Sequence, residues 1–289
     1  MRVISDAADS RAVGEALGAD LAAEGLRAVM VLSDGLNVNG TTLAEGITAT
    51  VGPGVIVTGG LAGDGPRFVS TWILADGEVG DQRVVAVGLY GDRLEVGHGS
   101  RGGWDPFGPV RKVTHAVGNK LFSIDGRPAL DLYKEYLGER AEGLPATALL
   151  FPLALREPKQ PDRELVRTIL AVDEDELSMT FAGDIPEGAH VQLMRANFER
   201  LIEGAATAAD ITLANLDGGS PVLAVAVSCV GRRLVLGEAT EDEVEVTMEA
   251  LPAGSVQVGF YSYGELSPAT TGTCELHNQT MTITAYRER

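Results

Sequence analysis

Residues 28–58, AVMVLSDGLNVNGTTLAEGITATVGPGVIVT, contain the pattern that decides the fold. The apolar run at 28–32 predicts a strand, and a second apolar run at 55–58 predicts another. Between them, three apolar residues share one face of a helix: Leu43, Ile47 and Val51. The stretch therefore predicts a β-α-β unit, with parallel strands and a right-handed connection.

On the N-terminal side of this unit, residues 9–26 predict an amphipathic helix with no strand before it. A sheet that starts in this way lacks a partner strand, so we expect that an N-terminal piece of the chain is missing. We also expect residues 1–35 to expose a sheet edge or an apolar patch. Such a surface favours self-association, which makes a homo-oligomer an expectation.

On the C-terminal side, three strand-like runs with turn residues between them predict an antiparallel meander, at residues 67–74, 82–90 and 94–100. The second half of the chain again mixes strands with covering helices. The predicted fold class is therefore α+β, with two domains of mainly antiparallel sheet covered by helices and one β-α-β unit near the N-terminus. We place these domains at residues 1–126 and 127–289.

Composition excludes several classes of function. The 289 residues include 23 basic and 41 acidic side chains, a formal net charge of −18. Without clustered Lys and Arg, the chain is not expected to bind nucleic acid or an anionic membrane surface. No apolar run approaches the ~18 residues of a membrane span, and the N-terminus resembles no secretory signal. Because the chain has only 2 cysteines, a reduced cytoplasmic protein is the expectation.

Two glycine-rich segments follow predicted strands. Residues 97–102, GHGSRG, match G-x-G-x-x-G, but Pro106 and the glycines after them prevent the helix that a dinucleotide site needs, so we interpret this match as chance. Residues 59–65, GGLAGDG, could bring backbone amides to a ligand, which makes Gly60 and Asp64 candidate contacts. The alternative is a structural turn.

Cys229 follows the apolar run at 222–227 and precedes Arg232 and Arg233. A helix starting there, with two arginines, would lower the pKa of the thiol, and His277 could then serve as a distant base. This arrangement predicts a Cys-His thiol hydrolase as one alternative. A packed, unreactive thiol is the interpretation that we favour, so no catalytic residue is assigned otherwise.

Metal and cofactor sites have little support in the sequence. Cys274 and His277 have metal-like spacing, but no second pair completes a structural site, so no metal is expected. The other histidines stand singly. Haem held through one axial histidine remains an alternative, because a single ligand carries no motif.

The C-terminal region gathers polar and aromatic groups in an apolar setting. The candidates for a small-molecule pocket there are Tyr261, Tyr263, Glu265, His277 and Asn278. The loop that follows residues 222–227 could converge with the loops that carry these residues. In that case Arg232 or Arg233 could bind a ligand carboxylate, and Glu265 could bind a ligand ammonium group. The ligand would then be an amino acid or a similar zwitterion. The alternative is that Glu265 pairs internally with an arginine.

Several motifs, in the same order along nearly the whole chain, resemble the FIST family, F-box and intracellular signal transduction proteins. They are residues 59–64, 102–108 with Trp104, 125–130, 228–233, 259–268 and 276–280. The resemblance implies a FIST N and a FIST C half and a sensory module that binds small ligands, with amino acids as one suggestion. Some members bind haem and respond to nitric oxide. Family members usually start further upstream.

The resemblance adds the glycine-rich segment with Trp104 to the candidate ligand contacts. No kinase, cyclase, methyl-accepting or F-box segment accompanies the motifs, so output through a separate signalling protein is expected. The function expected from sequence is therefore a cytoplasmic sensory module for a small molecule.

Overall fold

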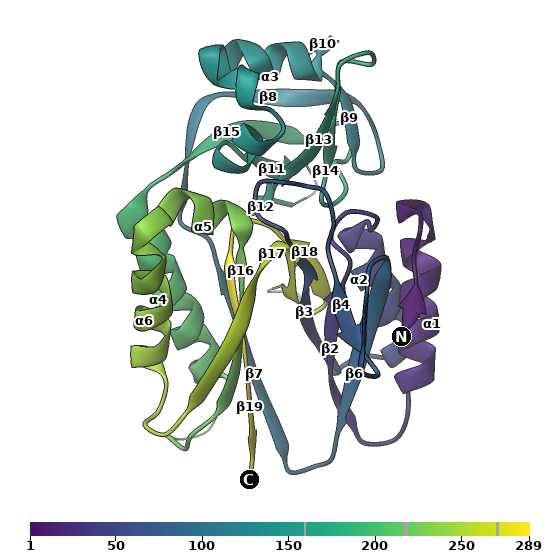
Figure 1. The fold of residues 1–289 in the computed structure, drawn as a ribbon, viewed down its shortest axis with the longest axis vertical. Helices are drawn as coiled ribbons and strands as arrows, with labels where there is room; N and C mark the ends of the chain where they lie inside the picture. The colour runs from purple at the N-terminus through teal and green to yellow at the C-terminus, as the bar shows by residue number, and fades with distance from the viewer. Residues whose placement is uncertain (159, 217–218, 270–271) are drawn as a thin grey trace.

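The computed structural model describes residues 1–158, 160–216, 219–269 and 272–289. Two layers are built around separate sheets (Figure 1). A large sheet, flanked by helices on both sides, forms one layer, and a second sheet with one helix lies across its end. The fold is α+β with two domains of mainly antiparallel sheet, as the sequence predicts.

The large sheet has nine strands among the described residues, in the order β1-β6-β2-β3-β17-β16-β19-β7, with β18 paired to β17. Their bounds are β1 (Arg2–Val3), β2 (Leu26–Ser33), β3 (Ile56–Ala62), β6 (Arg83–Tyr90), β7 (Leu94–Arg101), β16 (Leu223–Cys229), β17 (Val256–Pro268), β18 (Cys274–His277) and β19 (Met281–Glu288). Within the described part of the chain, strand β7 pairs only with β19, and its other edge has no partner strand there.

Helices cover the two ends of this sheet (Figure 1). They are α1 (Ser10–Leu21) and α2 (Gly40–Val51) over β2, β3 and β6, and α4 (Phe198–Ala214), α5 (Val230–Leu236) and α6 (Thr240–Ala250) at the other end. The apolar face predicted for α2 is buried, since Leu43 and Ile47 pack with Val31 of β2. At the other end, Ala208 of α4 packs with Ile283 of β19.

Two β-α-β units meet in the middle of the sheet. Strands β2 and β3 are parallel, which confirms the unit predicted near the N-terminus. Strands β16 and β17 are also parallel and are joined through α5 and α6, a second unit that the sequence analysis missed. Because β3 and β17 are antiparallel neighbours, the order β6-β2-β3 on one side repeats as β19-β16-β17 on the other.

The second sheet has eight strands among the described residues, in the order β12-β11-β15-β8-β9-β14-β13, with β10 on β9. The bounds are β8 (Trp104–Val117), β9 (Lys120–Ile124), β10 (Arg127–Pro128), β11 (Leu153–Glu157), β12 (Gln160–Arg167), β13 (Ile169–Asp173), β14 (Ser178–Phe181) and β15 (His190–Ala196). Helix α3 (Ala129–Leu137) packs on it through Leu130 and Tyr133. A small hairpin, β4 (Ile73–Ala75) and β5 (Glu78–Gly80), stands apart.

Two expectations are wrong. Residues 67–101 form no continuous meander, because β6 pairs with β1 and β2 whereas β7 pairs with β19 at the opposite end of the sheet. The first helix is not without a preceding strand, since β1 pairs with β6 and forms the sheet edge, where Val3 is 68% exposed. The domain boundary at 126/127 remains a prediction, because each sheet takes strands from both sides of it.

Candidate functional site

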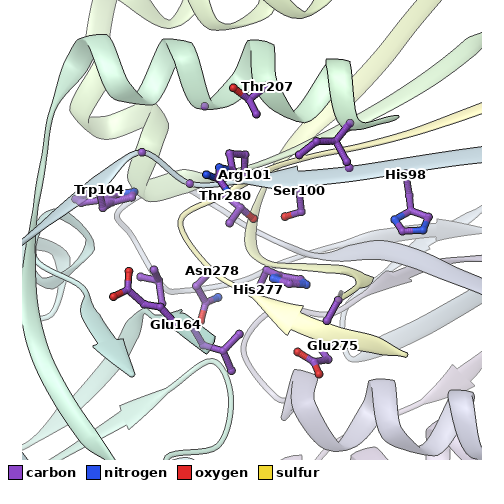
Figure 2. Close-up of a pocket in the computed structure, with 18 of the residues that line it drawn as sticks. His98, Ser100, Arg101, Trp104, Glu164, Thr207, Glu275, His277, Asn278 and Thr280 are labelled. Atoms are coloured by element: carbon purple, nitrogen blue, oxygen red, sulfur yellow. The ribbon is translucent and has the colours of Figure 1, made fainter. Parts of the chain in front are cut away.

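A cleft of about 1150 Å³ lies beside the open edge of β7, between α4, the start of β8, β12 and β18 (Figure 2). Side chains alternate along a strand, yet neighbouring residues of β7 from both faces reach the cleft: His98, Ser100 and Arg101. The cleft therefore surrounds the strand edge, where backbone groups meet no neighbouring strand of the described ranges.

Charged and polar groups line this cleft. The guanidinium of Arg101 makes no hydrogen bond or ion pair with another residue of the described ranges, and the residue is exposed. Carboxylates come from Glu203 of α4 and Glu275 of β18. The imidazole of His98 is largely removed from solvent, and burial lowers its pKa, so it is neutral at physiological pH. The cleft thus offers a cation, carboxylates and a neutral imidazole around one space.

Two of the three glycines of residues 97–102, Gly97 and Gly99, are explained by packing. A Cβ atom at Gly99 would lie 2.3 Å from the carbonyl oxygen of Ala208, and one at Gly97 would lie 2.2 Å from that of Thr212. Helix α4 therefore approaches β7 closely, and only glycine leaves room for it. The match to a dinucleotide motif is indeed not followed by a helix, yet the segment lines the cleft.

Glu265 of β17 is buried directly behind the cleft wall. Its carboxylate accepts hydrogen bonds from the hydroxyl of Ser262 and from the hydroxyl and the backbone amide of Thr280, at 2.9 and 3.2 Å for the latter two. Burial raises the pKa of Glu265 to about 8, although these hydrogen bonds and the charge of Arg232 oppose the shift. Thr280 itself lines the cleft, so one residue separates the buried acid from the open space.

Arg232 does not face a ligand. Its Nε donates to Glu243 Oε1 at 2.6 Å and its Nη2 to the carbonyl oxygen of Leu201 at 2.7 Å, and the arginine and the glutamate are fully buried. Glu243 also accepts from Ser228 and from Tyr261. The expectation that this arginine binds a ligand carboxylate is therefore wrong, because an internal carboxylate already neutralises it.

Arg233, the other candidate, is exposed and lies over the ring of Tyr261, 5.2 Å from its centroid. Neither residue lines the cleft. The sequence predicts that Arg232 or Arg233 binds a ligand opposite Glu265. The structure instead has two separate internal clusters, one around Glu243 and one around Glu265.

Cys229 is fully buried at the start of α5, and burial, with the nearby charge of Glu265, raises the pKa of its thiol. This is the opposite of the lowered pKa that a nucleophile needs, and the charge of Arg232, which acts to lower the pKa, does not outweigh burial. His277 lies at the cleft, where its Nε2 is 3.1 Å from the carbonyl oxygen of Ser267. The structure therefore gives the Cys-His hydrolase alternative no geometric support.

Asp64 is used inside the protein. Burial acts to raise its pKa, but hydrogen bonds from the hydroxyl of Tyr263 and from the amides of residues 68–70 outweigh burial and lower it. The ring of Tyr263 stacks on Phe68 at 4.7 Å. Gly60 is buried in β3 opposite Glu265. Asp64 and Tyr263 therefore hold the loop after β3 against β17, and none of these three predicted contacts lines the cleft.

Three predicted contacts do line the cleft: Trp104, His277 and Asn278 (Figure 2). The indole nitrogen of Trp104 donates to the carbonyl oxygen of Gln279 at 3.2 Å. The amide of Asn278 bridges Thr168 and Tyr263, at 3.2 and 3.0 Å. The tryptophan and the asparagine thus shape the wall with polar atoms that are already hydrogen-bonded.

Sequence reasoning missed the residues that define the cleft, above all Arg101, Ser100 and Glu203. The sequence does contain one signal for Arg101 and Ser100, because both lie in the glycine-rich segment 97–102. Glu203 gave no signal, since a charged residue on a long helix reads as a solvated surface position. Only the pairing of β7 at the sheet end brings these groups together.

The FIST N domain model matches residues 1–127 and the FIST C domain model matches residues 129–268. The chain is a FIST domain protein. Both halves of the family are present in their usual order, and FIST domains are sensory modules of signal transduction. No curated protein matches the chain.

Haem, the cofactor of some FIST proteins, fits the cleft poorly. Two histidines line it, His98 and His277, but its walls also carry Glu203, Glu275 and Arg101. Burying those charges against an apolar macrocycle would be unfavourable. Within the described ranges, no three His, Cys, Asp or Glu side chains are grouped as a metal site requires. None of the described helices is long and apolar enough to cross a bilayer.

Proposed function

We propose that this FIST domain protein is a sensory module that binds a small zwitterion of the amino acid type in the cleft beside β7. The observation that carries the proposal is the guanidinium of Arg101, which has no partner among the residues that the structure describes, in a cleft that Glu203 and Glu275 also line. A guanidinium such as that of Arg101 binds a ligand carboxylate with two parallel hydrogen bonds. The carboxylates of the cleft can accept hydrogen bonds from a ligand ammonium group. Apolar residues, including Leu165 and Ile211, would contact the ligand side chain.

A thermal-shift and calorimetric screen of the free amino acids against the full chain tests this proposal. The Arg101→Gln variant should lose tenfold or more in affinity, because a charged hydrogen bond contributes about 1.5–3 kcal/mol. Arg93→Gln is the matched control, since Arg93 pairs with Glu288 away from the cleft. If no amino acid binds, or if both variants bind as the wild type does, the proposal is wrong.

The signalling output belongs to the same proposal. The sensory module acts in the cytoplasm through a separate signalling protein. Self-association also remains a prediction, supported by the exposed Val3 on the edge strand β1. Light scattering of the wild type and of Val3→Lys tests it, and a strict monomer at high concentration contradicts it.

A further inference from the structure

Three hydroxyl groups form a row that starts at the cleft and reaches the buried acid. Ser100 Oγ lies 2.8 Å from Thr282 Oγ1, which lies 3.3 Å from Thr280 Oγ1. Thr280 in turn donates to Oε2 of Glu265. Ser100 and Thr280 both line the cleft (Figure 2), whereas Glu265 has no exposed surface.

We propose that Glu265 is a positioning residue of the cleft, which must hold a proton when a ligand carboxylate binds to the hydroxyl of Thr280, so that binding takes up a proton wherever the free protein has lost it. This inference rests on the proposed function for its ligand. The threonine hydroxyl has a single hydrogen. When that hydrogen turns toward a ligand carboxylate, Glu265 loses one of its three donors, and a buried carboxylate without that donor binds a proton from solvent. The proton comes from solvent and forms an O–H bond on the carboxylate of Glu265, and no other covalent bond forms or breaks.

The surroundings of Glu265 accommodate both protonation states. In the charged state, Ser262 donates to Oε1. In the neutral state the acid can donate to Ser262, because the serine hydroxyl has a second acceptor within reach, the carbonyl oxygen of Ser228 at 3.4 Å. Burial raises the pKa of Glu265 to about 8, so the exchange falls close to physiological pH.

Other ionisable groups face Glu265 from the elements packed around it. Cys229 at the end of β16 stays a neutral thiol, because burial raises its pKa. Arg232 of α5 favours the charged acid, but Glu243 of α6 neutralises that arginine. His277 of β18 is the register partner of Glu265. Strand β3 contributes only a glycine at this register.

The first test uses the unliganded full chain with carbon-13-labelled glutamate carboxyls, followed by NMR from pH 5 to 10. The wild type should show one carboxyl that titrates near pH 8, and this signal should be missing in Glu265→Gln. Thr280→Val and Ser262→Ala should each raise its midpoint by about one pH unit, because each removes a donor to the charged form. Thr284→Val is the matched control on β19 and should leave the midpoint unchanged.

The inference is overturned if no glutamate titrates near pH 8, or if Thr280→Val and Thr284→Val shift the midpoint equally. A second test measures the affinity of the best-binding amino acid from the screen. Between pH 7 and pH 9, the affinity of the wild type should fall, and this loss should be about tenfold larger than the loss of affinity in Glu265→Gln over the same range. Equal pH profiles contradict the linkage. If no amino acid binds, the proposed function fails, and the first test still decides whether Thr280 controls the proton on Glu265.

Discussion

Arg232 and Glu243 form an ion pair that solvent does not reach, with Nε of the arginine 2.6 Å from Oε1 of the glutamate. The pair joins α5 to α6, the two helices that connect the parallel strands β16 and β17. Ser228 and Tyr261 bind the same carboxylate from these strands. The second β-α-β unit is therefore held together by one charged cluster.

Breaking that cluster should be costly. Arg232→Met leaves the carboxylate of Glu243 buried without a cation, so the free energy of unfolding should fall by about 3–5 kcal/mol. Arg233→Met removes only a contact with the ring of Tyr261 and should cost at most about 1 kcal/mol. Urea denaturation measures both variants. If both variants lose the same free energy of unfolding, the buried ion pair does not stabilise the protein more than the exposed arginine does.

Stability should depend on pH through Glu265. Its pKa rises from 4.5 in a free side chain to about 8 in the folded protein, so the native state holds a proton that the unfolded chain releases. The stability from this proton is fully present below pH 4.5 and is lost as pH rises to 8. Compared with Glu265→Gln, the wild type should therefore lose several kcal/mol across this range in urea titrations. Parallel curves for the two proteins would contradict this prediction.

The cysteines should be unreactive in the folded protein. Burial raises the pKa of the Cys229 thiol, and that of Cys274 to about 12, so little thiolate exists at neutral pH. A disulfide reagent should modify Cys274→Ser slowly, and rapidly only after denaturation. Fast reaction of the native variant would instead revive the thiol hydrolase alternative.

The close approach of α4 to β7 should depend on glycine. Gly99→Ala places a Cβ atom 2.3 Å from the carbonyl oxygen of Ala208, which should cost about 1–3 kcal/mol of stability. Gly102→Ala is the control, because the nearest atom to its Cβ is 3.7 Å away. Thermal unfolding compares the two variants, and a harmless Gly99→Ala would refute the packing explanation.

The sequence predicts local structure well where the pattern is local. The strand at 28–32, the apolar face of α2 and the parallel partner at 55–58 follow from spacing alone, and all are present. Pairing between distant strands does not follow, because β7 and β19 are separated by 179 residues between Arg101 and Met281 yet pair directly. The edge they form decides where the cleft lies.

Several predicted site residues do not line the cleft, for a related reason. Arg232, Glu265 and Asp64 are charged groups close to predicted strands, a pattern that buried internal pairs and ligand sites share. Only three-dimensional contacts distinguish them, and here each is already bound to an internal partner. Arg101 has no such partner among the described residues and was missed, because an exposed arginine is unremarkable in a sequence.

Ligand binding in the cleft is tested most directly by calorimetric titration of the full chain with the amino acid that gives the largest thermal shift. The comparison is between the wild type, Thr207→Trp and Asp210→Trp, because Thr207 of α4 lines the cleft (Figure 2) whereas Asp210 lies on the same helix and does not. We predict saturable binding to the wild type and to Asp210→Trp, and clearly weaker binding to Thr207→Trp, whose indole would occupy part of the cleft. Equal binding to all three proteins would contradict a ligand site beside β7.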